Sequence, residues 1–363
     1  NSSSVNLPIG IALLPIIFLV LLLSINVFIY GDDSLNGTNQ FILILSGLFG
    51  ASLGFIYKVS YKKILKSISN SVKSVTGALL ILLFVGALAG TWMISGVIPS
   101  MVYYGLKILD PNIFLPACVI ICSIISVATG SSWTTSATVG IALVGIGKAL
   151  GIPPGMVGGA VIAGAYFGDK LSPLSDTTNL AAAVTKVDLF KHIKYLTYTT
   201  IPSISITLIV FIILGFLQVS NGSTDNSYLL TAITEKFNIS LVLFIVPILV
   251  LIMIIKKTPP LIALVIGTLV GALFSIIFQP QIIAELSADS NSKLINTYVV
   301  IMDTITGPVS IETNNAMLND LFSTGGMLGM LNTIFLVIGT MVFGGVMEAI
   351  GALKTISKTL LEW

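Results

Sequence analysis

The sequence contains no arginine, one histidine and two cysteines, and these absences exclude several classes of function. All 17 basic residues are lysine, so the chain lacks the guanidinium groups that usually contact nucleic-acid phosphates in pairs. It has no zinc-ligand spacing, no paired-histidine motif and no phosphate-binding loop. Cys118 and Cys122 lie four residues apart in an apolar segment, where packing is their expected role. We therefore expect no enzyme, no cofactor and no nucleic-acid partner.

Charge is scarce and apolar residues are abundant along the whole chain. Only 9% of residues are charged and 55% are hydrophobic, with a mean hydropathy of +1.04. A hydrocarbon core about 30 Å thick is crossed by a helix of about 20 apolar residues. The pattern predicts an all-α polytopic membrane protein embedded in a lipid bilayer. We predict spans at 8–30, 41–57, 75–98, 113–129, 199–219, 239–255, 261–279 and 331–350.

Lysines concentrate in three connecting segments, residues 58–73, 186–194 and 256–257. Because lysine-rich loops stay on the cytoplasmic side, these segments are predicted to face inward and 31–40, 220–238 and 280–296 to face outward. Within the second segment, residues 182–195 have the pattern of a short amphipathic helix lying in the inner membrane surface. The predicted location is the inner (plasma) membrane of a bacterium, crossed several times.

Short polar residues interrupt the apolar pattern in two regions, 130–180 and 297–330, and the first region contains two polar stretches, 130–138 and 164–180. In the second stretch, Pro173 cannot donate a backbone hydrogen bond and disfavours helical angles at Ser172. Asp169 and Asp176 thus flank a predicted break. A charged residue at mid-bilayer costs roughly 2.5–3.5 kcal/mol on insertion scales, so carboxylates at this depth indicate a functional site.

Oxygen atoms around this break suit a hard cation such as Na⁺. Backbone carbonyls freed by the break can combine with side chains into an oxygen shell, as in broken transporter helices. A carboxylate in such a shell also binds protons, so Na⁺ and H⁺ compete, which is the mechanism of an antiporter. The side chains predicted to contribute are Ser172, Ser175, Asp176, Thr177, Thr178 and Asn179.

Further residues are candidates for the lining of the same cavity. From the hydroxyl cluster we expect Ser131, Ser132, Thr134 and Thr135, because hydroxyls satisfy backbone groups freed by a helix break. Lys170 either neutralises Asp169 as an ion pair or provides a counter-charge for an anionic substrate. Glu348 lies near the inner end of a predicted span, where it either pairs at the membrane surface or carries protons.

The run Gly168-Asp169-Lys170-Leu171-Ser172-Pro173-Leu174-Ser175-Asp176-Thr177-Thr178-Asn179-Leu180-Ala181 resembles the signature of the NhaC-type Na⁺/H⁺ antiporter family. Residues 130–135, 325–327 and 344–348 resemble other recurring segments of that family, which belongs to the wider ion-transporter superfamily. The resemblance implies inverted repeats, broken helices with re-entrant hairpins, and commonly a homodimer. It also implies ion binding at Asp169, Ser172, Asp176, Thr177, Thr178 and Asn179, with Asp176 and Thr177 as the expected Na⁺ ligands.

Weak internal symmetry favours the inverted repeat. Segments 85–96 and 339–351 can be aligned so that Gly90 meets Gly345 and Gly96 meets Gly351. Lysine positions give the two helices opposite directions across the membrane, as an inverted repeat requires. We predict four parts: helices 1–74, a first repeat 75–198, connecting helices 199–296, and the start of a second repeat at 297–363. The partner of 130–180 is expected beyond Trp363.

Three functions remain to be weighed. The first is secondary active Na⁺/H⁺ antiport, and the second is Na⁺- or H⁺-coupled exchange of small organic acids, such as malate or lactate, or of amino acids. The resemblance covers both, because the family includes exchangers of organic acids. A channel or a membrane enzyme is third, since nothing in the chain repeats like a selectivity filter or supplies a catalytic set.

Asp176 provides a first test. The substitution Asp176→Asn keeps the side-chain volume and removes the titrating group, so exchange is expected to stop while the protein still inserts. Transport in vesicles, measured beside protein yield, checks this. Normal exchange by a well-folded Asp176→Asn protein would contradict the assignment.

Overall fold

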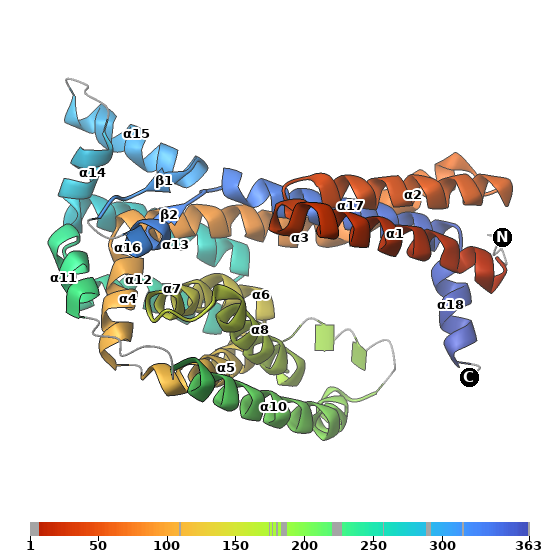
Figure 1. Ribbon diagram of the computed structural model, residues 1–363, viewed down its shortest axis with the longest axis horizontal. Coiled ribbons are helices and arrows are strands. Elements are labelled where there is room, and N and C mark those ends of the chain that lie inside the picture. The colour runs from red at the N-terminus through yellow and green to blue at the C-terminus, as the bar shows by residue number, and fades with distance from the viewer. Residues whose placement is uncertain are drawn as a thin grey trace. The chain divides into compact units, whose positions relative to one another are not determined.

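The computed structural model describes residues 7–108, 110–173, 175, 177–178, 181–182, 187–219, 227–256, 258–287, 292–313 and 316–361. These residues are almost entirely helical (Figure 1), with one antiparallel pair of two-residue strands, β1 (Val309–Ser310) and β2 (Ser323–Thr324). Among them, seven helices are long and apolar enough to cross a membrane, or eight if a bent pair forms one span. The predicted all-α polytopic class is confirmed.

The chain divides into two compact units, and the first contains residues 1–82 and 330–363. Its helices pack through small residues. On α2, Gly47 approaches the backbone of Phe343, and Gly339 of α17 approaches the backbone of Gln40. Small residues let apolar helices approach closely in a membrane. The elements are α1 (Ile9–Tyr30), η1 (Gly31–Leu35), α2 (Thr38–Ile56), the first part of α3 (Tyr61–Ile94), α17 (Leu331–Ala349) and α18 (Ala352–Leu361).

Within this first unit, α3 and α17 run in opposite directions where they touch. Ser67 donates a hydrogen bond to Glu348 at 3.2 Å, and Gly345 packs on the backbone of Ile68 and near Ser71. Residue numbers therefore rise along α3 as they fall along α17. A side chain at Gly345 would collide with the Ile68 backbone, so this contact needs a glycine.

The second unit contains residues 83–329 and holds the polar segments singled out in the sequence. Its helices are connected mostly by short turns (Figure 1). Besides the end of α3 and the two strands, its elements are α4 (Val97–Ile108), α5 (Pro111–Thr129), α6 (Ser132–Thr135), the π-helix η2 (Ser136–Gly140), α7 (Ile141–Ala149), α8 (Pro154–Leu171), α10 (Leu189–Val219), α11 (Ser227–Lys236), η3 (Leu241–Phe244), α12 (Ile245–Ile255), α13 (Pro260–Phe278), α14 (Pro280–Leu286), α15 (Lys293–Thr306), α16 (Ala316–Leu321) and η4 (Leu328–Met330).

Helices α5 and α8 form the closest helix pair of the second unit's polar region, and they run parallel. Gly164 of α8 lies on the carbonyl of Val119, and Gly168, one turn later, lies on the carbonyl of Ser123. Since both numbers rise together, the carboxyl ends of the two helices lie side by side. Such glycine-mediated approach of backbones replaces the hydrophobic driving force that helices lack in lipid.

Two predicted spans begin much earlier than hydropathy indicated. Helix α3 starts at Tyr61 rather than near 75, so Lys62, Lys63, Lys66 and Lys73 lie on a helix and not in a loop. Helix α10 starts at Leu189, so the part 189–195 of the predicted surface helix 182–195 continues into the span, and 183–186 lie outside the described residues. Hydropathy detects only the apolar part of a helix, whereas lysine is a good helix former and extends it into water.

The predicted span 239–255 is also different in the structure. Helix α12 begins only at Ile245, after the 3₁₀ turn η3, and α11 occupies part of the predicted outer loop 220–238. The two helical stretches, 229–236 and 241–254, are bent by 85°. This geometry is that of a broken span or a re-entrant loop.

The glycine pairs that indicated a repeat share their local conformation. Gly90 and Gly345 both lie directly on a neighbouring backbone, of Thr304 and Ile68 respectively. Gly96 and Gly351 both take positive φ, 79° and 82°, where a helix ends. The inverted repeat and the four predicted domain boundaries remain predictions.

The α5–α8 contact can be tested with two glycines of one helix. The substitution Gly164→Ala places a methyl group against the Val119 carbonyl, whereas Gly158→Ala has nothing within 4 Å of the added atom. We expect Gly164→Ala to destabilise the protein by about 1–3 kcal/mol and to lower its thermal midpoint in detergent. Gly158→Ala should leave stability unchanged or raise it, because alanine favours helix over glycine. Equal midpoints would contradict the contact.

Candidate ion-binding site

Both α5 and α8 end abruptly, and their sequences explain why. Gly130 follows α5 in the left-handed conformation (φ 70°, ψ 20°), which glycine adopts without steric cost. Ser172 follows α8 with extended angles (φ −81°, ψ 128°), as expected for a residue that precedes proline. The Ser172 hydroxyl donates to the carbonyl of Val127 at 2.8 Å and so joins the two helix ends.

From this junction, the segment that begins with the hydroxyl cluster 130–138 runs back along α8 toward the start of that helix. Gly147 and Gly140 lie on Val157 and Val161, and Ser132 lies beside Asp169, so α6, η2 and α7 run antiparallel to α8. The non-helical residues 130–131 and 172–173 therefore lie at the same level. Only residues 130 and 131 of the cluster are non-helical, because helical structure resumes at Ser132 and continues through the π-helix.

Asp169 lies in the last turn of α8 and is 8% exposed. Its carboxylate accepts a hydrogen bond from the Ser132 hydroxyl at 3.0 Å. A carboxylate near a helix carboxyl end faces the negative end of the helix dipole, which is unfavourable without compensation. A cation beside this carboxylate would offset that cost.

Hydroxyl groups after Pro173 support the end of α8. The Thr178 hydroxyl contacts the carbonyls of Asp169 at 3.3 Å and Lys170 at 3.2 Å in the last turn of α8, and the Asp169 carbonyl also accepts from the Ser172 amide at 3.3 Å. The hydroxyls of Ser175 and Thr177 are 3.0 Å apart, and the amide of Thr178 donates to Ser175 at 3.4 Å. The Thr178 bonds hold that residue at the carboxyl end of α8.

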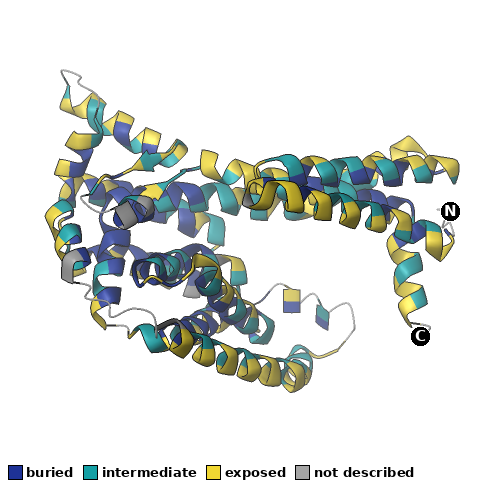
Figure 2. Cartoon of the chain, in the orientation of Figure 1, coloured by how far each residue is buried: buried dark blue, intermediate teal, exposed yellow. Residues whose placement is uncertain are grey.

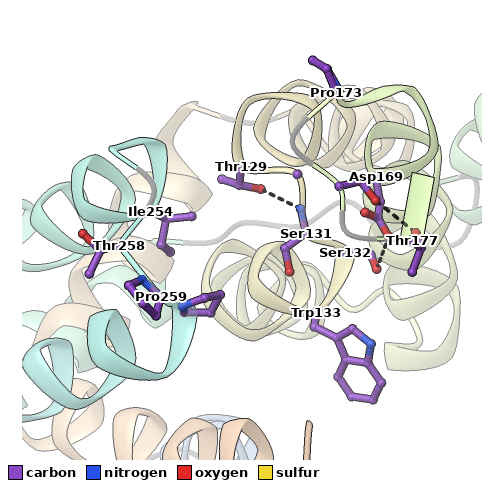
Figure 3. A pocket seen from close by; sticks show the side chains of 13 residues that line it. Thr129, Ser131, Ser132, Trp133, Asp169, Pro173, Thr177, Ile254, Thr258 and Pro259 are labelled. Carbon is purple, nitrogen blue, oxygen red and sulfur yellow. Dashed lines mark hydrogen bonds between the residues drawn. The ribbon is translucent and has the colours of Figure 1, made fainter. Parts of the chain in front are cut away.

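The two breaks open on one cavity of about 490 Å³ (Figure 3). One wall comes from the ends of α5 and α8 with α6, and the facing wall comes from the turn between α12 and α13. The Ser132 and Asp169 side chains meet on the first wall. The lining residues are Thr129, Gly130, Ser131, Ser132, Trp133, Asp169, Pro173, Ser175, Thr177, Ile254, Thr258, Pro259 and Pro260.

The charge of this lining favours a cation. Asp169 is its only ionisable residue among the described ones, and no lysine or histidine joins it. Two helix carboxyl ends add partial negative charge. Pro259 and Pro260 on the facing wall have no amide hydrogen, so they offer an anion no backbone donor. Hydroxyl, carbonyl and carboxylate oxygens are the ligands that hard cations prefer.

Several predicted residues come together in the structure. Asp169, Ser131, Ser132 and Thr177 all line the cavity. Three others are buried and hydrogen-bond to backbone carbonyls around the cavity. Ser172 joins the ends of α5 and α8, Thr178 contacts the last carbonyls of α8, and Thr135 donates to the Ser131 carbonyl at 2.9 Å. Ion binding by these residues remains a prediction.

Other predicted residues lie away from this cavity, or are not among the described residues. Lys170 makes no ion pair with Asp169 in the described part of the chain; its ammonium lies 5.0 Å from the Tyr166 ring centre, in a separate groove. Glu348 belongs to the first unit and is exposed. The Thr134 side chain, Asp176 and Asn179 lie outside the described residues.

Some lining residues were not predicted from sequence. Thr129 adjoins the hydroxyl cluster, and its oxygen accepts from the amide of Ser131 at 3.4 Å (Figure 3). In the sequence, residues 258–260 are only a Thr-Pro-Pro turn after two lysines, and this pattern does not indicate a binding site. Nothing in a single sequence brings that turn beside residue 130.

Thiol labelling checks the exposure of the cavity. A cysteine at Thr177, which is exposed on the cavity, is expected to react with a charged methanethiosulfonate reagent in membranes. A cysteine at Ser126, which is 0% exposed, should react far more slowly. The native Cys118 and Cys122 are fully buried and should add little background. Equal labelling at both positions would contradict the cavity.

Comparison with known proteins identifies the family. A family model described as the Na⁺/H⁺ antiporter family matches residues 164–363. The malate-2H⁺/Na⁺-lactate antiporter of Bacillus subtilis is 40% identical over 345 residues, which cover 94% of this chain and 69% of that protein. The Na⁺/H⁺ antiporter NhaC of Alkalihalophilus pseudofirmus is 36% identical over 318 residues (88% and 66%). The arginine/ornithine antiporter ArcD of Halobacterium salinarum is 33% identical over 353 residues (96% and 69%).

No solved structure matches this chain. The chain spans about two thirds of the length of the curated relatives that it matches. Those relatives are named as antiporters, which agrees with the family that residues 168–181 indicated for this chain. The chain is therefore a multi-pass membrane transporter that belongs to the Na⁺/H⁺ antiporter family.

Proposed function

We propose that this protein exchanges Na⁺ for H⁺ across the membrane, and that Asp169 binds the two ions alternately. The observation that carries this proposal is the cavity itself. Its described lining contains one nearly buried carboxylate, several hydroxyls and no basic side chain. Such a lining neutralises a cation and repels an anion.

Competition at one carboxylate supplies the coupling. Na⁺ is bound by the ionised carboxylate, so its binding requires the release of the proton. Ser132 donates to Asp169 and keeps lone pairs that can face a cation. Ser131, Thr177 and Thr129 add hydroxyl oxygens around the same cavity. Asp176 and Asn179 remain proposed ligands from the sequence.

The packing of α5 on α8 supports a single, coherent binding site. The Ser172 hydroxyl joins the two helix ends, and residues of both ends line the cavity. Because Gly164 and Gly168 let the backbones touch, the two ends are expected to move together when the site changes its access. The bacterial plasma membrane and a homodimer remain our predictions for location and assembly.

A second candidate is coupled exchange of a small organic acid. The Bacillus subtilis relative is named as a malate/lactate antiporter, and a cavity of about 490 Å³ exceeds the volume of one ion. The described lining, however, supplies no cationic group for a carboxylate substrate. Lys170, the proposed counter-charge, lines a different groove. The charge of the cavity therefore favours the first candidate.

Proteoliposomes with an imposed pH gradient test the proposal. Addition of Na⁺ alone should collapse the gradient with the native protein and leave it intact with Asp169→Asn, because the amide neither titrates nor carries charge. The matched control is Asp303→Asn, since Asp303 is an exposed carboxylate of the same unit on α15. This control should exchange at the native rate.

The organic-acid arm separates the two candidates. Malate or lactate is added to the same vesicles with and without Na⁺. A gradient that collapses only when the organic acid is present would replace Na⁺/H⁺ antiport with the second candidate. Full exchange by Asp169→Asn would remove Asp169 from the site under either candidate.

A further inference from the structure

A second groove, of about 550 Å³, lies between α8 and α10. It combines one lysine with hydroxyl groups and apolar side chains, and no described residue in its lining is acidic. The lining residues are Ile162, Ala163, Tyr166, Phe167, Lys170, Leu196, Thr199, Thr200, Ser203, Ile204 and Thr207. All of them belong to the second unit, and none lines the ion cavity.

Lys170 is the charged group of this groove. Its ammonium lies 5.0 Å from the centre of the Tyr166 ring, one turn earlier on α8. A cation held over an aromatic face keeps its charge and can still bind an anion on its free side. Asp169 and Lys170, though adjacent in sequence, thus serve separate cavities.

The groove changes character along its length. Phe211 and Gly215, near the end of α10, contact Gly159 and Asn112 near the starts of α8 and α5, so α10 runs antiparallel to α8. The beginning of α10 therefore lies beside Lys170. Lys170, Thr199 and Thr200 lie at this end, whereas Ile162 and Ile204 line the other end.

More basic charge surrounds the polar end. Lys191 and Lys194 lie on the first turns of α10 and are exposed. The nearby Asp188 carboxylate is occupied in capping the helix, where it accepts from the amides of Phe190 and Lys191 at 3.1 Å each. The local field at this end of the groove is therefore positive, which suits a phosphate group.

The outer face of α10 is exposed along its length (Figure 2) and carries isoleucines such as Ile206, Ile209 and Ile213. In a membrane protein, an exposed aliphatic helix face meets acyl chains. A groove with a basic, hydroxyl-bearing end and an apolar end along such a face matches a molecule with an anionic head and a hydrocarbon tail. We propose that an anionic phospholipid binds here, with its phosphate on Lys170 and one acyl chain between α8 and α10.

The full chain purified from membranes of phosphatidylglycerol and phosphatidylcholine tests this proposal by native mass spectrometry. We expect phosphatidylglycerol to be retained in preference to phosphatidylcholine. Lys170→Gln should reduce that retention about fivefold, the effect of one lysine at an anionic membrane surface. Lys170→Arg should preserve it, because the charge remains.

Lys107→Gln is the matched control. Lys107 also lies over a tyrosine, 4.4 Å from the ring centre of Tyr103, but it lines none of the described cavities. Its substitution should leave retention unchanged. If Lys170→Gln folds poorly, Ala163→Trp fills the groove while keeping the lysine, and it should also release the lipid.

Three results would overturn the proposal. Unchanged retention in both Lys170→Gln and Ala163→Trp would mean that lipid does not occupy the groove. Displacement of phosphatidylglycerol by millimolar inorganic phosphate would indicate a site for the free anion. A shift between monomer and dimer in these variants, with lipid retention unchanged, would show that a second copy of the chain covers the groove.

Discussion

The site depends on one contact, the parallel packing of α5 against α8. Gly164 and Gly168 carry no side chains, so the backbones touch and the two helices end side by side. Helix carboxyl ends each carry about half a negative charge, and here two of them converge on one cavity. Ser172 fastens the junction by donating to the Val127 carbonyl. Without that approach, Asp169 and Ser132 would have no common cavity.

Asp169 lies where a helix disfavours negative charge, and only 8% of its surface is exposed. Ser132 offsets part of this cost with a hydrogen bond, and Thr178 contacts the neighbouring carbonyls. The carboxylate still gives the cavity a negative potential, because no basic residue is among the described residues of the lining. Under the proposed function, a proton and Na⁺ occupy this carboxylate in turn. Under the proposed function, the polar breaks that interrupt these helices are also the place where the ions exchange.

Hydropathy predicted where the spans lie, because burial in lipid depends on composition alone. It misplaced the starts of α3 and α10, since lysine-bearing turns such as 61–73 and 189–195 continue a helix into water without an apolar signal. Within the site, Ser132 and Asp169 were predicted from local breaks at glycine and proline. Thr258 and Pro259 were not, because their place in the cavity depends on how α12 and α13 pack. Lys170, adjacent to Asp169 in sequence, lines the other groove, because one residue of helix turns a side chain by about 100°.

The most direct measurement of the central claim is proton release on Na⁺ binding, followed with a pH indicator in weakly buffered, detergent-solubilised protein. If Asp169 exchanges the two ions, the native protein should release up to about one proton per bound Na⁺ where the carboxyl is protonated. Asp169→Asn should release none. Na⁺ binding without proton release at every pH, or undiminished release by Asp169→Asn, would contradict the account.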